Sequence, residues 1–579
     1  LTLPAAQNAI HLLPIWEPGV VGSLYGMSSW RINVEFFSKE LAQHLPHLDT
    51  VEKQLRAVVN LLHITGRAVG MDVVPHTDRY SEMAFLYPEY YEWLQREDLT
   101  IVSHKENLHE EVQEKIFKFV TLAGTADEDE LLPKDAKDLF SPQSSEERRE
   151  LVILGPPQER GLRNKRRVAL VRFISKYGYE PVPATMAPPY RGIEVNPDPA
   201  AKRVDSHGLI WRDYKITKPQ PMSRVFGPLA RYKLFERIDD NNHWEIDFEK
   251  PRQAVWDYVC EKYAQVQERY GFDFMRGDMS HVQMREEGPP LEHHPHYDIL
   301  GAVKEHVRLE SGVSHFAYFA ESFIAPRDVM TYGDEIDHLE VSLADAALGD
   351  MQSLVVGTPE YLQRLRYYAD ITATRSFAAA FTLFTGDKDD PRFDEYYATG
   401  SVIRLFTALG LADFPSYMGL GFETRDIHLE RAPNEHYTKL YVFEEHSGPN
   451  ATCGPWKWGK NGALYRALTR VRLYFDALWK ELAGAKTKWL LPPDPTGNYP
   501  IIAWTQEGDA KQVFVCNTSS EKTFTEVTIP LPKELALAFT FSTYEPAAVS
   551  EKPLEKNDRH RVKRLFPGEC RAYTVSQGS

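Results

Sequence analysis

The sequence has little cysteine, with 4 residues of this type in 579. No two of them form a Cys-x-x-Cys pair, so neither a zinc site nor a disulfide framework is predicted, and reduced thiols in a cytoplasmic protein are expected. The four are Cys260, Cys453, Cys516 and Cys570.

Long apolar runs are also missing. No stretch of about 18 uninterrupted apolar residues occurs, so no membrane partner is predicted. The first residues, LTLPAAQNAIHLLPIW, carry no basic group before their apolar part, which argues against a secretory signal. Because the first residue is Leu1 rather than Met, a processed signal remains open.

Positive charge is scarcer than negative charge, with 67 Lys and Arg against 83 Asp and Glu and a formal net charge of -16. A general polyanion-binding surface is therefore not expected, and nucleic acid is not a predicted partner. Aromatic residues make up 12% of the chain, and their flat faces suit neutral, polyhydroxylated ligands. The core of a large protein accounts for such rings equally well.

Apolar runs alternate with amphipathic helices in the early and middle parts of the chain, which is long enough for several domains. A run at 8–16, a helix at 49–66 and a run at 68–75 form a strand–helix–strand unit, which predicts a parallel sheet. A helix at 251–270 and an apolar run ending at Asp278 repeat this step. Further strand candidates stand at 315–322, 341–350, 375–386 and 414–423, and a helix at 463–482 closes the series.

Two regions depart from this alternation. Between residues 77 and 243 it stops, which indicates a large insertion. A basic helix near 163–177 either contacts phosphate or nucleic acid or presents a solvated face, and we favour the solvated face. From about residue 492, short alternating strands separated by turn residues predict a β-sandwich.

Carboxylates follow three of the apolar runs, at Asp278, Glu321 and Asp389. The carboxyl ends of parallel strands in a barrel face one pocket, so these side chains are expected to meet. Arg276 is expected to point the same way as Asp278 and to help keep it ionised, although Arg-x-Asp by itself is more typical of a strand-end ion pair. One carboxylate as nucleophile and one protonated carboxyl as acid, about 5 Å apart, are what retaining glycoside chemistry needs.

These segments resemble the conserved regions of the α-amylase superfamily, glycoside hydrolase family 13, across nearly the whole chain. DVVPHT at 72–77 is similar to the first region, MRGD at 275–278 to the second, FAES around Glu321 to the third and DKDDPR at 387–392 to the fourth. The resemblance implies an α/β protein: a (β/α)8 TIM barrel with a large insertion domain after the third strand and a C-terminal antiparallel β-sandwich.

The implied organisation has four parts. The first part of the catalytic barrel is 1–76, the insertion domain 77–243, the remainder of the barrel 244–491 and the sandwich 492–579. The family's first strand and helix would precede residue 8, where only seven residues stand. We therefore expect either that upstream residues are missing or that another segment fills the gap.

The resemblance also implies a role for each matched residue. Asp278 is the nucleophile, Glu321 the general acid/base, and Asp389 the acid that grips sugar hydroxyls in the transition state. Arg276 orients Asp278, and Asp72 forms the floor of the central subsite. The remaining substrate-binding candidates are Tyr25, His76, His281, Lys388 and Arg392. Tyr25 either stacks on the sugar or packs under a loop, and His281 is either a substrate contact or a helix-start histidine.

At several positions the sequence differs from the motifs that are usual in the family. The family usually has Asn-His after the third strand and Asn-His-Asp in the fourth region, whereas His76-Thr77 and Asp387-Lys388-Asp389 stand here. DMSH at 278–281 is more similar to the maltosyltransferase branch, which moves maltosyl units between α-1,4-glucans. No Asp-rich cage of recognisable spacing appears, so no metal is predicted, and no organic cofactor is implied.

The leading hypothesis is a retaining enzyme that acts on α-glucosidic bonds of α-1,4-glucans or maltooligosaccharides through a covalent glycosyl-enzyme, by hydrolysis or by transfer. An alternative, favoured by the altered histidines, is a non-catalytic amylase-like protein that binds carbohydrate or a protein partner. A third is a glycosyltransferring enzyme that uses a phosphorylated sugar, which Lys388 would attract. The oligomeric state is not predicted.

Overall fold

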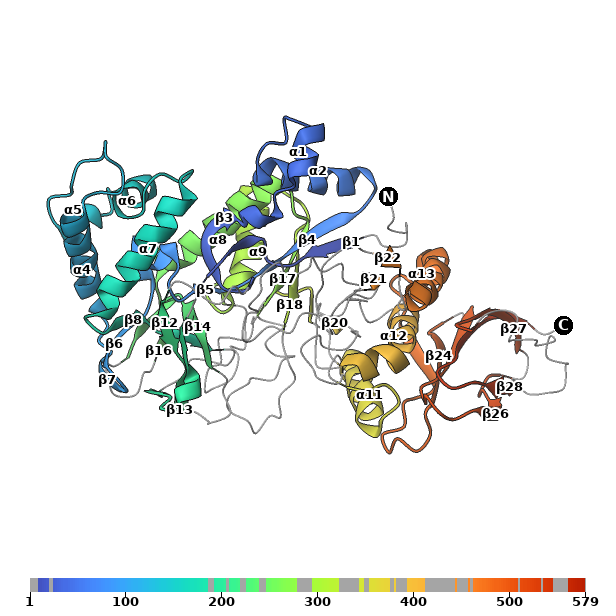
Figure 1. Cartoon of the computed structure of the whole chain (residues 1–579). Coiled ribbons are helices and arrows are strands. Elements are labelled where there is room, and N and C mark those ends of the chain that lie inside the picture. The colour runs from blue at the N-terminus through green and yellow to red at the C-terminus, as the bar shows by residue number, and fades with distance from the viewer. Residues whose placement is uncertain are drawn as a thin grey trace. The chain divides into compact units, whose positions relative to one another are not determined.

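The computed structural model describes most of the chain, in two compact units that we consider separately. The N-terminal unit spans Ala9–Leu343, and the C-terminal unit contains the described residues from Ala344 onward (Figure 1). The described residues are 9–19, 24–185, 192–204, 208–218, 225–238, 246–278, 294–321, 343–347, 354–374, 380–381, 393–411, 443–444, 457–458, 462–508, 511–532, 535–544 and 561–577.

A parallel sheet lies in the middle of the N-terminal unit. Its strands, in spatial order, are β1 (Ala9–Leu12), β4 (Ala68–Val73), β17 (Phe274–Gly277) and β18 (Ala317–Ala320). The helices that precede the last three of these strands are α2 (Val51–Ile64), α8 (Gln253–Tyr270) and α9 (Ile299–Glu310). Strands that alternate with helices and pair in parallel are what the sequence predicted, so this part of the prediction is confirmed.

Local signals explain where these helices begin and end. Helix α2 begins after Thr50, whose hydroxyl accepts a hydrogen bond from the Lys53 N–H, and it ends before Gly66, which has a φ of 76°. Helix α8 ends at Gly271, which has a φ of 77°. A left-handed glycine at this position stops the helix and turns the chain directly into β17.

The predicted closed barrel is not established by the described strands. The C-terminal unit holds one more parallel pair, β19 (Ala346–Ala347) and β20 (Ala380–Phe381). The strand candidate at 414–423 lies outside the described residues. The (β/α)8 barrel therefore stays a prediction, and so do the four domain boundaries.

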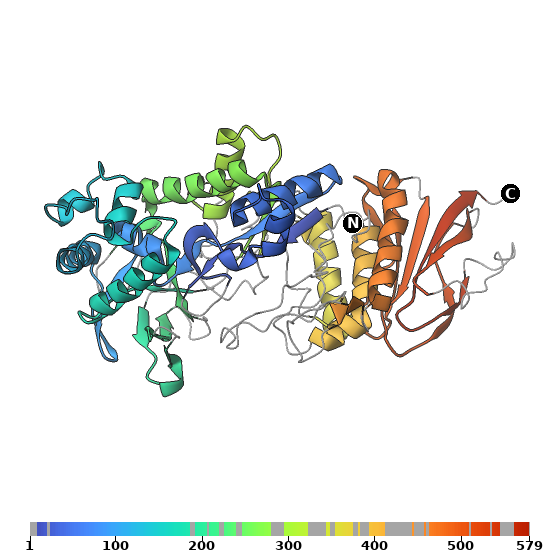
Figure 2. The ribbon, with the colours of Figure 1, turned by 45° about the horizontal axis from the view of Figure 1, so that its top comes forward.

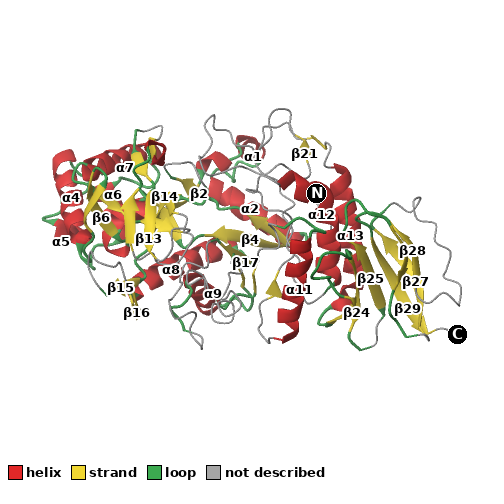
Figure 3. Cartoon of the chain, turned by 90° about the horizontal axis from the view of Figure 1, so that it is seen from below, coloured by secondary structure: helices red, strands yellow, loops and turns green. Residues whose placement is uncertain are grey.

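A long insertion separates β4 from α8 and contains a helical lobe and several small antiparallel sheets (Figures 1 and 3). The helices are α3 (Glu82–Leu86), α4 (Leu108–Ala123), α5 (Ala136–Leu139), α6 (Glu146–Ile153) and α7 (Arg160–Ser175). The strands that pair with β5 (His76–Asp78) or with one another are β6 (Trp93–Glu97), β7 (Thr100–Ser103), β8 (Tyr179–Pro181), β9 (Pro183–Thr185), β10 (Gly192–Val195), β11 (Lys202–Val204), β12 (Ile210–Arg212), β13 (Tyr214–Lys218), β14 (Val225–Arg231), β15 (Phe235–Arg237) and β16 (Ile246–Pro251). Before β4, the chain forms the hairpin β2 (Trp16–Pro18) and β3 (Met27–Ile32) and the short helix α1 (Lys39–His44).

The C-terminal unit ends in an antiparallel β-domain, as predicted. A five-stranded sheet has the order β23 (Thr487–Leu491), β24 (Ile501–Gln506), β25 (Gln512–Asn517), β29 (Cys570–Gln577) and β27 (Leu535–Ser542). A second pair consists of β26 (Phe524–Thr528) and β28 (Arg561–Leu565), and one apolar cluster joins both sheets. Strands β23 and β28 were not predicted.

Three helices accompany the sheet of the C-terminal unit, and Figure 2 shows them in yellow and orange beside its strands. They are α11 (Pro359–Thr374), α12 (Phe393–Gly410) and α13 (Gly462–Leu482), and a small pair, β21 (Phe443–Glu444) with β22 (Lys457–Trp458), lies between α12 and α13 in the chain. The ring of Phe406 on α12 lies 5.9 Å from that of Phe514 on β25, which places α12 on the sheet. None of the helices in the described part of the chain combines the length and the apolarity needed to cross a membrane.

Candidate active site

The candidate site lies at the carboxyl ends of β4, β17 and β18. Asp72 is the penultimate residue of β4, Asp278 directly follows β17, and Glu321 directly follows β18. The parallel ladder continues past the strand ends, because the Asp278 N–H donates to Val73 O (2.8 Å) and the Glu321 N–H donates to Gly277 O (2.9 Å). Acids that are far apart in sequence are thus brought to the same edge of the sheet, as the sequence analysis expected.

One guanidinium group holds all three of these carboxylates. Arg276 Nη1 lies 3.0 Å from Asp72 Oδ1 and 2.6 Å from Asp278 Oδ1. Its Nη2 lies 2.7 Å from Glu321 Oε1. We call these four residues the Arg276 cluster. The side chains of Asp278 and Glu321 remain 15% and 12% exposed, whereas that of Asp72 is 2% exposed, so a ligand can reach the first two most readily.

The two outer carboxyl groups are held side by side, because the two terminal nitrogens of one guanidinium each contact one of them. Neighbouring carboxyl groups disfavour ionising together, and Glu321 acts to lower the pKa of Asp278, so the pair favours one proton and one negative charge. That is the combination that a general acid beside a nucleophile needs.

Burial and charge set the protonation of the cluster. Burial by itself would raise the pKa of Asp72. Arg276 and His11 lower it by more than burial raises it, so the pKa of Asp72 falls to about 2. Burial also raises the pKa of Asp278, and the Asp72 carboxylate adds to this increase, so the pKa of Asp278 is raised although Arg276 lowers it. The sequence argument that Arg276 keeps Asp278 ionised therefore included only one of the contributions. Burial lowers the pKa of Arg276, but the carboxylates outweigh it and hold the group charged.

Two further side chains contact Asp72. The Tyr25 hydroxyl donates to Asp72 Oδ2 (2.9 Å), from the loop between β2 and β3. His11 Nε2, on β1, lies 3.7 Å from Asp72 Oδ1. The sequence analysis did not single out His11, and the one available signal was a histidine inside an otherwise apolar strand. Its approach to Asp72 depends on the parallel pairing of β1 with β4.

His76 lies on β5 and is buried. Burial lowers its pKa to about 3, while the nearby Tyr25 backbone acts in the opposite direction. The ring is therefore neutral around pH 7. Its assignment as a substrate-binding residue stays a prediction.

Gly277 allows β17 to approach its neighbours closely. A Cβ atom at this position would come within 2.5 Å of Leu300 Cδ1 and 2.7 Å of the Tyr318 ring. The Tyr318 hydroxyl in turn donates to Asp298 Oδ2 (2.8 Å), and Asp298 Oδ1 accepts from the Leu300 N–H at the start of α9. This packing fixes the backbone between Arg276 and Asp278, and burial raises the pKa of Asp298 to about 7.

The remaining predicted site residues lie outside the described part of the chain. These are Asp389, Lys388, Arg392 and His281. Within the described ranges, no group of three or more His, Cys, Asp or Glu side chains is arranged to hold a metal ion. The geometry of the site is thus built from β1, β4, β17, β18 and the Tyr25 loop.

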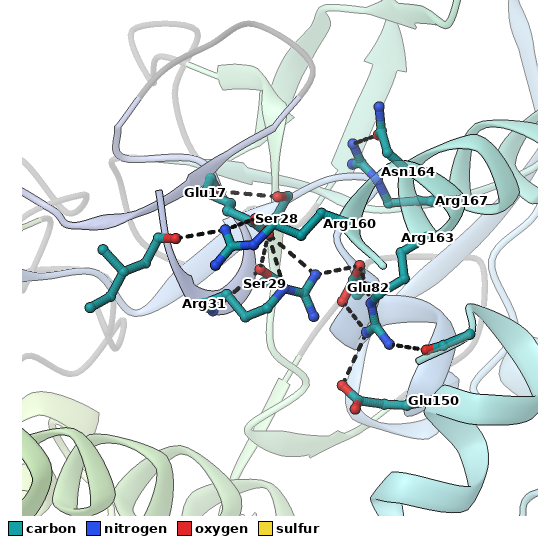
Figure 4. Close-up of polar contacts among 12 residues, drawn as sticks. Glu17, Ser28, Ser29, Arg31, Glu82, Glu150, Arg160, Arg163, Asn164 and Arg167 are labelled. Atoms are coloured by element: carbon teal, nitrogen blue, oxygen red, sulfur yellow. Dashed lines mark hydrogen bonds and ion pairs between the residues drawn. The ribbon is translucent and has the colours of Figure 1, made fainter. Parts of the chain in front are cut away.

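A second buried ion-pair cluster joins the hairpin β2–β3 to the insertion (Figure 4). This Glu82 cluster has three carboxylates and three guanidinium groups, those of Glu17, Glu82, Glu150, Arg31, Arg160 and Arg163. Arg31 Nη2 lies 2.7 Å from Glu82 Oε1, and Arg163 Nη2 lies 2.6 Å from Glu82 Oε2. Because β2 and β3 flank the loop that carries Tyr25, the Glu82 cluster anchors one wall of the site.

Helix α7 turns two of its arginines inward while Lys165 and Arg172 are exposed, so the predicted solvated face accounts for only part of the charge of this basic helix. Arg163 is 0% exposed and Arg167 8% exposed. Arg163 donates to Gly155 O (2.6 Å) as well as to Glu82, and Arg167 donates to Tyr80 O (3.0 Å). Carboxylates and carbonyl groups of neighbouring segments satisfy these charges, which is why they can be buried.

Comparisons with known proteins find likeness in structure only. No protein-family model matches the chain, and no curated protein sequence matches it. An α-amylase from H. orenii has a TM-score of 0.49 and 11% identity, with 98% of this chain and 90% of that chain covered. A trehalose-6-phosphate hydrolase from Bacillus licheniformis has a TM-score of 0.49 and 13% identity, with 99% and 93% covered. An α-amylase from Geobacillus thermoleovorans, complexed with acarbose, has a TM-score of 0.48 and 11% identity, with 99% and 90% covered.

Likeness at this level does not establish family membership or activity. The solved structures that resemble this chain are named as α-amylases and as a trehalose-6-phosphate hydrolase. We therefore base the proposed function on the side chains of the Arg276 cluster.

Proposed function

We propose that the protein is a retaining glycoside hydrolase or transglycosylase that acts on α-glucosidic bonds of α-1,4-glucans or maltooligosaccharides. The observation that carries this proposal is the pair Asp278 and Glu321, held by the two terminal nitrogens of one guanidinium. Carboxyl groups held by neighbouring nitrogens of one guanidinium lie close together, which favours the separation of about 5–5.5 Å found in retaining enzymes over the about 6.5–9.5 Å that leaves room for water in inverting enzymes.

The proposed reaction has two steps. In the first, the Asp278 carboxylate attacks the anomeric carbon while Glu321 gives its proton to the departing glycosidic oxygen, which leaves a covalent glycosyl-enzyme. In the second, Glu321 takes a proton from water or from a sugar hydroxyl, which attacks the same carbon and releases Asp278. Each step inverts the carbon once, so the product keeps the α configuration.

The surrounding charges support this division of roles. Three carboxylates around one guanidinium leave an excess of negative charge, which stabilises the positive charge that develops on the sugar ring in the transition state. Asp72 and Tyr25 would hold the central sugar, and Asp389 would bind its hydroxyls. Transfer to a sugar, as in the maltosyltransferase branch, is the finer part of the proposal and requires an acceptor that competes with water.

The test is a product profile from the purified protein and maltotetraose, separated by chain length, with the anomeric configuration of the first products followed by NMR. Products both longer and shorter than the donor identify transfer, and shorter products alone identify hydrolysis. Asp278→Asn should abolish both reactions. Asp273→Asn, at the opposite end of the same strand, is the matched control and should keep activity. No turnover by the wild-type protein, or full turnover by Asp278→Asn, would contradict the proposal.

A further inference from the structure

Two cysteines face each other across neighbouring strands of the C-terminal sheet. Strands β25 and β29 are antiparallel, and Cys516 lies directly opposite Cys570. The Asn517 N–H donates to Glu569 O (2.9 Å), so the residues next to the cysteines form a hydrogen-bonded pair of the ladder. Hydrogen-bonded and non-hydrogen-bonded pairs alternate, which places the two cysteines in a non-hydrogen-bonded pair, where side chains are closest.

This position meets the geometric requirement of a disulfide. The Cα atoms of a non-hydrogen-bonded pair lie about 4.5 Å apart, and disulfides span Cα separations of about 4.4–6.8 Å. Both cysteines are free in the structure, and the Cys516 thiol is near enough to raise the pKa of Cys570. Neither strand has to move far for the two sulfur atoms to bond.

The two thiols are enclosed between the sheet and the helices. Cys516 and Cys570 are each 0% exposed. Val513 and Val515 of β25 belong to the apolar cluster between the two sheets, and side chains alternate along a strand, so Cys516 points to the other face. Tyr361 of α11 lies near both thiols, which add to the effect of burial in raising its pKa to about 12.

We propose that Cys516 and Cys570 form a disulfide site, which closes when the protein meets a small disulfide oxidant while strands β25 and β29 are accessible. The thiolate of one cysteine attacks the oxidant and forms a mixed disulfide, with one thiol leaving. The second cysteine then attacks the protein sulfur and releases the second thiol. The protein loses two hydrogens and the oxidant is reduced to two thiols. This site is independent of the proposed glycosidase activity.

The reaction is expected to depend on opening of the structure. Burial, and then the neighbouring Cys516 thiol, raise the pKa of Cys570 well above its ordinary value, so little thiolate is present in the closed sheet. Oxidation should therefore be slow in the native protein and fast during refolding. The sequence predicted no disulfide, because cysteines this far apart in the chain show no pattern until the strands are paired.

The test exposes the full chain to reduced and oxidised glutathione in graded ratios, once as native protein and once during refolding from denaturant. The protein is then denatured, its free thiols are blocked with N-ethylmaleimide, and the digest is examined by mass spectrometry. We expect a peptide from β25 joined to one from β29, two hydrogens lighter than the pair of thiol peptides. Cys260, a buried thiol on α8, should be alkylated throughout and serves as the matched control.

Two results would overturn this inference. One is that Cys516 and Cys570 are alkylated, or separately joined to glutathione, at every ratio in both experiments. The other is that the linked protein has lost its native circular dichroism or melts at a lower temperature than the reduced protein. We expect the linked protein to melt several degrees higher, because the crosslink restricts the unfolded chain, and Cys516→Ala should abolish this difference.

Discussion

The two buried ion-pair clusters of the N-terminal unit differ in their charge balance. In the Glu82 cluster, three guanidinium groups face three carboxylates, with Glu52 as an outer fourth partner 3.5 Å from Arg160. Burial is outweighed by Arg163 and Arg31, so the pKa of Glu82 is lowered. In the Arg276 cluster, one guanidinium faces three carboxylates, and the pKa of Asp278 is raised. In the Glu82 cluster, guanidinium groups of the protein itself neutralise the Glu82 carboxylate. The Arg276 cluster retains a deficit of positive charge that a proton or a cationic transition state can fill.

The charge balance distinguishes the structural Glu82 cluster from the proposed catalytic Arg276 cluster better than the burial of their side chains does. Both clusters contain arginines with almost no exposure, because Arg163 is 0% and Arg276 9% exposed. Arg163 and Arg160 also donate to backbone carbonyls, which ties the Glu82 cluster to the fold. Both terminal nitrogens of Arg276 instead contact acids that approach the surface at a strand end.

The largest effect is expected from Glu321→Gln, which removes the proposed acid/base. Turnover of maltooligosaccharides should fall about 10²–10⁴-fold, while the free energy of unfolding stays the same or rises, because one of the crowded carboxylates is lost. Steady-state kinetics and urea denaturation measure the two quantities. A substrate with a fluoride leaving group needs no proton in the first step and should lose less of that step's rate. Equal losses on both substrates would argue against Glu321 as the acid.

The same substitution in the other cluster, Glu82→Gln, should have the opposite outcome. It leaves Arg31 and Arg163 without their shared carboxylate, so the free energy of unfolding should fall by about 3–5 kcal/mol. The activity per folded molecule should be kept. Glu52→Gln is the control, because Glu52 is the outer partner of Arg160 and is 35% exposed, and it should change stability by less than about 1 kcal/mol. If Glu82→Gln is as stable as the wild type, the Glu82 cluster is not the structural element proposed here.

Acid should weaken the Arg276 cluster through Asp72. The pKa of Asp72 is about 2 in the folded protein against an ordinary value of 3.8, so folding favours its ionised form. This contribution, on the order of 2–3 kcal/mol, is present above about pH 4 and is lost as the pH falls toward 2. Urea denaturation at a series of pH values in this range should show the loss, and Asp72→Asn should flatten that part of the curve. A wild-type curve that is already flat would contradict the assignment.

The smallest effect is expected from Tyr25→Phe, which removes one hydrogen bond to Asp72 and keeps the ring. Asp72 retains Arg276 and His11, so the loss of unfolding free energy should be about 1.5 kcal/mol. The pKa of Asp72 should move upward, because the hydroxyl lowers it. An NMR titration of the Asp72 carboxyl checks this shift. If KM rises while kcat is kept, the ring position matters for sugar binding, whereas the stability loss alone indicates a structural contact.

Much of the local structure could be predicted from the sequence. The apolar periodicity at 49–66 and 251–270 predicted α2 and α8, and the short apolar runs predicted β4, β17 and β18, because these patterns act over a few residues. The order of strands and helices then allowed Asp278 and Glu321 to be placed at one edge of a sheet. Whether the strands close into a barrel depends on elements that lie outside the described residues.

Other features depend on contacts between distant segments. His11 reaches Asp72 only because β1 pairs with β4, and Arg163 of α7 is buried only because carboxylates of other segments meet it. Cys516 and Cys570 become neighbours only through the pairing of β25 with β29. Such partners leave no local pattern, since the sequence between them sets no distance in space.

The sequence by itself determined which carboxylates stand at the strand ends and that a cation accompanies Asp278. The tertiary structure decided how these charges balance: it placed three carboxylates on Arg276, buried Asp72 almost completely, and raised the pKa of Asp278 against the effect of the neighbouring cation. The reason is physical. Side-chain identity is local, but desolvation and Coulomb interactions depend on everything that surrounds a charge, and only the folded chain sets those surroundings.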